Sequence, residues 1–84
     1  MKFFDGQKLV KQKEFGKALG VFLKLEKKNS KDIRIFFYLG LIYFELNKYN
    51  NSILYYNKYL EKDPKSISVL HNLAILRQTI GEFD

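Results

Sequence analysis

Residues 36–43 read FFYLGLIY and residues 70–77 read LHNLAILR, so that a leucine followed by a small residue recurs 34 positions along the chain. In both stretches a large apolar residue, Phe36 or Leu70, stands three positions before that leucine. An internal period of this size is typical of stacked helical hairpins, each of which buries its apolar face against the next one. Such stacks usually hold other molecules, so the recurrence predicts a binding architecture rather than an enzyme.

The composition predicts one small domain that is stabilised by packing. The chain has 84 residues, of which 46% are hydrophobic and 17% aromatic, which is far too apolar for a disordered tail. It has no cysteine, which excludes disulfide bonds, a thiolate zinc site and a cysteine nucleophile. Asp5 interrupts the apolar start, and no run approaches the roughly 18 apolar residues of a membrane span. By default we expect a cytoplasmic protein.

The charge is strongly basic and unevenly distributed. The formal net charge is +6, and lysines are concentrated in the first 31 residues. This balance favours acidic partners and would support weak binding to nucleic acid or anionic lipid. The alternative, which we favour, is a solvated lysine surface, because a basic patch alone is only one part of a nucleic-acid interface. The lysines are Lys2, Lys8, Lys11, Lys13, Lys17, Lys24, Lys27, Lys28 and Lys31.

The hydrophobic periodicity predicts an all-α fold with about five helices. No segment alternates with a period of two, so a sheet has no support. The short connections predict that neighbouring helices run antiparallel. The predicted helices span residues 2–13, 15–28, 33–46, 50–62 and 67–80.

The residues between these segments are typical of helix ends. Asn47 and Gly81, which also lie 34 positions apart, are each suited to the left-handed conformation that ends a helix. Asp63-Pro64 ends the fourth segment, because a proline disfavours helical geometry in the residue before it. The predicted N-caps of the third and fifth segments are Asp32 and Ser66.

These features together resemble the tetratricopeptide repeat family, whose unit is a helix-turn-helix of 34 residues. The complete repeat is residues 33–66, the first repeat is 1–32 and is short at its N-terminus, and 67–84 is a partial third repeat, so the chain is a single array. Lys13 stands where the first turn would usually have glycine or asparagine. The complete repeat matches through Phe36, Leu39, Gly40, Tyr43, Tyr49, Ser52, Tyr56 and Pro64. The flanking repeats match through Gly6, Phe15, Ala18, Phe22, Leu70, Leu73, Ala74, Gly81 and Phe83.

The resemblance implies a right-handed α-α superhelix of antiparallel helix-turn-helix hairpins that binds protein partners in a concave groove. The packing logic can be stated without the family. Small residues such as Gly40 and Ser52 let two helices approach closely, while a large residue such as Tyr56 fills the wedge beside the contact. Since one hairpin cannot cover its own apolar face, stability depends on the neighbouring repeat.

Catalytic and cofactor sites have no support in the sequence. His71 is the single histidine, and no aspartate lies three or four positions from it on the same predicted helix. One histidine and scattered carboxylates do not make a metal-ligand cluster. Gly16 and Gly20 flank Lys17 inside a predicted helix and form no phosphate-binding loop. We therefore expect no enzyme activity, no cofactor and no metal.

The third predicted helix carries a second apolar stripe, on the side away from its packing stripe. A helix that is apolar all round should be buried all round. Two interpretations stay open: the stripe packs against neighbouring helices through Val10, Asn72 and Ile75, or it forms an apolar trough for a partner's helix or extended segment. The stripe is Phe37, Tyr38, Leu41 and Phe44, which the resemblance places in the groove. The other candidate groove residues are Gln7, Lys11, Arg34, His71, Asn72 and Ile75, which include a polar, partly basic rim.

We therefore expect a protein–protein interaction module, a scaffold or adaptor, whose partner is a peptide segment or helix of acidic or amphipathic character. One alternative is a basic helical repeat associated with RNA or other nucleic acid, which we consider the weaker interpretation. Another is the N-terminal, substrate-positioning part of a longer enzyme. The last predicted helix would expose an apolar strip and so predicts self-association. This strip is Val69, Leu73, Leu76 and Ile80.

Overall fold

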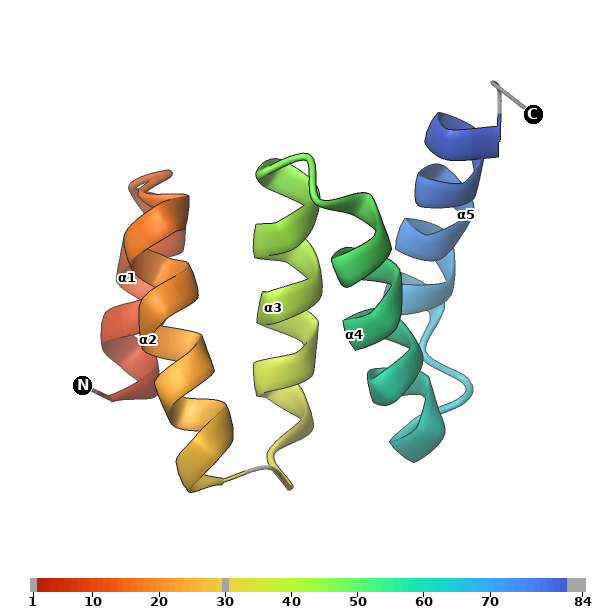
Figure 1. Cartoon of the computed structure of the whole chain (residues 1–84). Coiled ribbons are helices and arrows are strands. Elements are labelled where there is room, and N and C mark those ends of the chain that lie inside the picture. The colour runs from red at the N-terminus through yellow and green to blue at the C-terminus, as the bar shows by residue number, and fades with distance from the viewer. Residues whose placement is uncertain (1, 30, 82–84) are drawn as a thin grey trace.

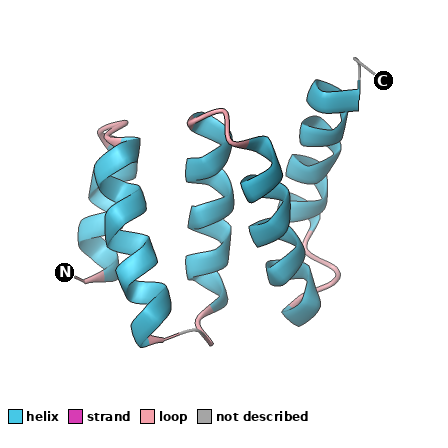
Figure 2. Ribbon diagram, viewed as in Figure 1, coloured by secondary structure: helices cyan, strands magenta, loops and turns pink. Residues whose placement is uncertain are grey.

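The computed structural model describes residues 2–29 and 31–81. These residues form helices and no strand, which confirms the all-α prediction (Figure 2). Every predicted helix end lies within two residues of the observed one. Phe83, which the resemblance includes in the third repeat, lies outside the described residues. The helices are α1 (Phe3–Lys11), α2 (Phe15–Lys28), α3 (Ile33–Glu45), α4 (Tyr49–Lys62) and α5 (Ile67–Gly81).

The five helices form an open row in chain order, with the two ends of the chain at opposite ends of the row (Figure 1). Each helix packs against the next one along the chain. The row measures 39 × 26 × 18 Å, and the smallest dimension is about that of two helix layers. Side chains of α1 and α5 also reach α3, so α1, α3 and α5 make one layer while α2 and α4 make the other.

The turns inside the two hairpins have the same backbone conformation. Lys13 has φ 61° and Asn47 has φ 63°, and these two residues are 34 positions apart. The prediction for Asn47 is therefore confirmed. The corresponding prediction for Gly81 is wrong, because Gly81 is the last residue of α5 and no glycine in the described residues has a positive φ. Glycine permits the left-handed conformation but does not enforce it.

The predicted helix ends have the expected local contacts. Asp32 Oδ1 accepts a hydrogen bond of 3.0 Å from the backbone N–H of Arg34, and Ser66 Oγ accepts one of 3.4 Å from that of Val69. Both side chains satisfy N–H groups that a helix start leaves unpaired. Helix α4 ends at Lys62, directly before Asp63-Pro64.

Within each hairpin, a glycine of one helix lies against an aromatic ring of the other. A Cβ at Gly6 would lie 2.6 Å from the ring of Phe22, and a Cβ at Gly40 would lie 2.6 Å from the ring of Tyr56. Both rings are fully buried. In the second hairpin, Ser52 Oγ also donates a hydrogen bond of 2.6 Å to the carbonyl oxygen of Gly40. These contacts require glycine, because carbon atoms pack at about 3.5–4.0 Å.

The hydrophobic core consists of two clusters along the row. The first core cluster is built around Ala18, Phe22, Ile35, Phe36, Leu39, Ile42 and Tyr55. The second core cluster is built around Tyr56, Val69, Leu73 and Leu76. Tyr59 of α4 packs against both clusters. The core is therefore elongated, as the open row of helices requires.

The prediction of an exposed strip at Val69, Leu73, Leu76 and Ile80 is wrong. The first three residues are buried in the second core cluster, and Ile80 is half-buried. They face back toward α4 and α3, because they occupy the same repeat positions as Ile35, Leu39 and Ile42. The apolar residues that α5 does expose include Ile67, Leu70 and Ile75.

Candidate functional site

The second apolar stripe of α3 lies between α1 and α5 and is only partly covered by them. Phe37, Tyr38, Leu41 and Phe44 are all half-buried, whereas Leu39 and Ile42 on the opposite side of the helix have no exposed surface. Helices α1, α3 and α5 therefore present a shared surface with apolar side chains at its centre. We call this surface the α1–α3–α5 face.

The half of this face next to α1 is built from a cluster of aromatic rings. The Tyr38 ring stacks on Phe22, with centroids 5.1 Å apart and an angle of 2° between the ring planes. Phe3 meets both rings edge-on at 5.5 Å. The amide Nε2 of Gln7 donates a hydrogen bond of 3.1 Å to the Tyr38 hydroxyl. Tyr38 is thus held rigidly, because its ring and its hydroxyl both have partners within the fold.

Arg34 covers the edge of this aromatic cluster. Its guanidinium carbon lies 4.1 Å from the centroid of the Phe3 ring, which is a cation–π arrangement. The same guanidinium forms an ion pair of 2.7 Å with Asp32, the N-cap of α3. Its hydrogen bond to the Asp32 carboxylate lowers the pKa of that carboxyl group. Arg34 is therefore oriented by one contact from α1 and one from the N-cap of its own helix, although its side chain is largely exposed.

Two open hollows of about 340 Å³ each lie along this half. Both include Gln7 and Tyr38, so they adjoin. Their volumes are at the lower end of the range for ligand pockets, roughly 300–1,000 Å³. One is lined by Phe3, Gln7, Arg34, Phe37, Tyr38, Tyr59, Ser66 and Ser68. The other is lined by Phe4, Gln7, Lys8, Val10, Lys11 and Tyr38.

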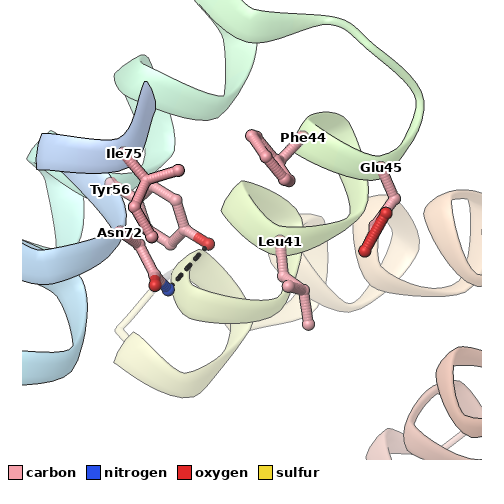
Figure 3. A pocket seen from close by; sticks show the side chains of 6 residues that line it. All are labelled: Leu41, Phe44, Glu45, Tyr56, Asn72 and Ile75. Atoms are coloured by element: carbon pink, nitrogen blue, oxygen red, sulfur yellow. Dashed lines mark hydrogen bonds between the residues drawn. The ribbon is translucent and has the colours of Figure 1, made fainter. Parts of the chain in front are cut away.

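The half of the face next to α5 contains a smaller and more apolar hollow. Its volume is about 100 Å³, and Leu41, Phe44 and Ile75 form its apolar walls (Figure 3). Glu45, Tyr56 and Asn72 complete its lining. A hollow of this size is too small for an ordinary small-molecule ligand. It suits a single apolar side chain presented by a larger partner.

A polar pair lies at the edge of this small hollow. The amide Nδ2 of Asn72 donates a hydrogen bond of 3.3 Å to the hydroxyl of Tyr56, and Figure 3 shows the two groups meeting beside Ile75. Burial raises the pKa of Tyr56 to about 12, and nearby Glu45 acts in the same direction, while the Asn72 hydrogen bond opposes them. The raised pKa extends the range over which the Tyr56 hydroxyl keeps its proton to above pH 10.

The charges around the face differ between its two sides. Lys8 and Lys11 on α1 are exposed beside one of the large hollows. Glu45 at the end of α3 is exposed beside the small hollow and forms no ion pair with another described residue. The face is thus basic toward α1 and acidic at the C-terminal end of α3.

The structure brings nine of the ten predicted groove residues to these three hollows. His71 is the exception: it is exposed on α5 but lines none of them. The two sequence interpretations of the α3 stripe stay open: Phe37 packs against Tyr56 and Tyr59 of α4 and also lines a large hollow, whereas Leu41 lies in the wall of the small hollow.

Several lining residues were not predicted, among them Phe4, Lys8, Glu45 and Tyr59. Phe4 has 70% of its surface exposed and shares a helical stripe with Lys8 and Lys11, at spacings of four and seven residues. That spacing could have indicated from the sequence that Phe4 and Lys8 lie on the same side of the helix as the predicted groove residue Lys11. Glu45 offered none, since a single carboxylate at a helix end has no periodic pattern.

Within the two described ranges, no group of three or more histidine, aspartate or glutamate side chains is placed to hold a metal ion. None of the helices described is long and apolar enough to cross a membrane.

Comparison with known proteins gives one family match. The family model for the tetratricopeptide repeat matches residues 33–66, which comprise α3, α4 and the connections that follow each of them. No curated protein and no solved structure shows a significant match to the chain.

Proposed function

We propose that this chain, whose residues 33–66 match the tetratricopeptide repeat family, is a non-catalytic interaction module that binds a peptide segment or short helix across the α1–α3–α5 face. Repeats of this family generally mediate protein–protein interaction. The observation that carries the proposal is the α3 stripe, which stays half-exposed over three hollows after the helices have packed. A scaffold or adaptor role follows from it.

The chemistry of the face favours an amphipathic partner. An apolar side chain would enter the small hollow between Leu41, Phe44 and Ile75, where it loses contact with water. Acidic groups of the partner would lie toward Lys8 and Lys11, and a basic group would lie near Glu45. Such rim charges set the orientation of a ligand and the rate of association more than its affinity.

The test compares peptide binding by two variants, one changed at a leucine inside the proposed groove and one at a leucine outside it. Peptides selected from a displayed random library on the wild-type chain would be titrated against Leu41→Ser and Leu54→Ser by fluorescence anisotropy. Leu41 lines the small hollow, whereas Leu54 is 52% exposed on α4 and lines none of the three hollows. We expect Leu41→Ser to weaken binding about tenfold or more, because it removes a central apolar anchor. Leu54→Ser should bind like the wild type.

Circular dichroism of both variants would show that each keeps its helices, so that a loss of binding reports the surface and not the fold. Equal binding by the wild type and Leu41→Ser, or a loss confined to Leu54→Ser, would contradict the proposed groove.

A second candidate function rests on the lysines of α2. Lys24, Lys27 and Lys28 are exposed around Leu25 near the end of that helix, and none forms an ion pair with another described residue. These lysines belong to α2 and not to the α1–α3–α5 face, so the two functions are separable. Nucleic-acid binding through them would fall steeply with salt, because phosphate contacts release counterions. Replacing all three by glutamine should abolish such binding and leave the peptide titration unchanged.

A further inference from the structure

One face of α5 is open where the equivalent face of α3 is covered. The repeat period places Ile67, Leu70 and Ala74 at the positions of Ile33, Phe36 and Gly40. Phe36 is only 7% exposed and Gly40 is buried, because α4 covers them. Leu70 is 46% exposed, Ile67 is 82% exposed, and Ala74 is also exposed. We call Ile67, Leu70 and Ala74 the open face of α5.

The equivalent faces of α1 and α3 are each covered by the following helix of the chain, so the fold contains two examples of a helix that fits such a face. On α1, the covering helix is α2, which contributes Ala18 and Phe22. On α3, the covering helix is α4, which contributes Ser52 and Tyr56. In both cases a small residue is followed four positions later by a large one, and both residues are completely or almost completely buried. The large residue lies over the glycine of the covered helix, at Gly6 or Gly40.

We infer that the open face of α5 is a docking site for an amphipathic α-helix that packs on it as α4 packs on α3. This helix carries a small residue followed, four positions later, by a large apolar residue that lies over Ala74. A serine at the small position would donate a hydrogen bond to the Ala74 carbonyl, as Ser52 does to that of Gly40 at 2.6 Å. The site is continuous with the packing of the row and separate from the α1–α3–α5 face.

Ala74 gives this site a different selectivity from the two covered faces. A methyl group at Gly40 would lie 2.6 Å from the Tyr56 ring, and Ala74 already carries that methyl group. A flat ring in the equivalent place would overlap with it, whereas a leucine can adjust its branched end around it. The open face therefore prefers a helix with leucine at the large position to one with tyrosine or phenylalanine.

A second copy of the chain fits this face less well. In a twofold symmetric pair the same surface meets itself, so Leu70 can lie over the partner's Ala74, but the large residue then precedes the small one, the reverse of the order that α2 and α4 use. Arg77, which occupies the repeat position of the aromatic Tyr43, would also be brought toward the partner's identical, like-charged surface. A helix with its small residue four positions before its large one has the order that α2 and α4 use and brings no second Arg77 to the contact.

The probes are two synthetic peptides with the sequence of residues 48–63, which span α4 with its flanking residues, one unchanged and one with Tyr56→Leu. Each would be titrated into the isotope-labelled 84-residue chain and followed by amide NMR shifts. Weak binding is expected, since a short peptide must become helical as it docks. The shifts should cluster at Ile67, Leu70 and Ala74, and the leucine peptide should bind at least about fivefold more tightly than the tyrosine peptide.

Two variants of the chain sharpen the test. Ala74→Gly recreates the Gly40 geometry and should strengthen binding of the tyrosine peptide at least about fivefold relative to the leucine peptide. Ala74→Lys places a charge on an exposed position of a helix that tolerates lysine, and should abolish binding of both peptides. Shifts that cluster on α3, no saturable shifts, or unchanged binding to Ala74→Lys would each overturn the inference. Concentration-dependent dimerisation through α5 that excludes both peptides would overturn it as well.

Discussion

Replacing Gly40 by alanine tests whether close approach of α3 and α4 decides the stability of the fold. The added Cβ would lie 2.6 Å from Cδ1 and Cε1 of Tyr56 and 2.9 Å from its Cζ. Carbon atoms pack at about 3.5–4.0 Å, so the contact is about 1 Å too short. The ring cannot move away freely, because it is 1% exposed and its hydroxyl accepts a hydrogen bond from Asn72. The two helices must therefore separate.

The size of the effect follows from two opposing contributions. Overpacking a buried contact costs about 1–3 kcal/mol, and three ring atoms in close contact place Gly40→Ala near about 3 kcal/mol. The change also gains about 1 kcal/mol, because alanine is the better helix former. The net loss of unfolding free energy is about 2 kcal/mol. For a domain of this size that corresponds to a fall in Tm of roughly 8–16 °C.

Gly20→Ala is the matched control. Gly20 lies inside α2, is exposed, and has no atom within 4 Å of the place where its Cβ would be. This change gains helix propensity without any clash, so Tm should rise by roughly 4–8 °C. Thermal unfolding followed by circular dichroism would compare the two variants with the wild type. A rise in Tm for Gly40→Ala like that for Gly20→Ala would refute the close-contact argument.

Three further predictions concern stability. Ser52→Ala should cost about 1 kcal/mol in urea unfolding, because it removes a buried hydrogen bond of 2.6 Å to the Gly40 carbonyl; no measurable loss would contradict this role. Lys13→Gly should stabilise the chain by about 1 kcal/mol, since lysine is strained at φ 61°, and the same assay would show a loss if the turn needs the lysine side chain. Because the fold raises the pKa of Tyr56 from 10.0 to about 12, its contribution to stability is complete below pH 10 and declines as the pH rises toward 12. The stability of Tyr56→Phe should therefore fall less steeply than that of the wild type over this interval.

The helices were predictable from sequence because their signals are local. Apolar periodicity, Asn47 and Asp63-Pro64 mark ends that depend on a few neighbouring residues. The turn at Lys13 was less evident, since lysine has no preference for a positive φ; only its offset of 34 positions from Asn47 indicates it. Gly81 shows the opposite error, because a permissive residue near a helix end does not fix where the helix stops.

The exposed side of α5 could not be identified from its apolar pattern alone. This helix has apolar residues on several sides, so both Val69 and Leu70 could have faced solvent. Comparison with α3 resolves the choice, because Val69 corresponds to the buried Ile35. Burial in a stack of repeats depends on which neighbours are present, and a single-helix pattern does not contain that information.

The candidate site was predictable in its location but not in its division of roles. The stripe of α3 pointed to the face, yet its periodicity could not separate Phe37, which packs against Tyr56 at the edge of a large hollow, from Leu41, which lines the small hollow. That separation depends on Tyr56 and Tyr59, which are distant in sequence. The absence of enzyme activity, the cytoplasmic location and self-association stay predictions.

The division of the core into two clusters bears on how the chain loses its structure. Helix α5 supplies Val69, Leu73 and Leu76 to the second core cluster and nothing to the first. Its detachment would therefore expose Tyr56 while leaving Phe22 and Leu39 enclosed. Amide protons of α5 should exchange with solvent through such partial opening, well before those of α3. A ligand that binds α5 would reduce this partial opening. Its affinity could then be measured from the slower exchange of the α5 amide protons.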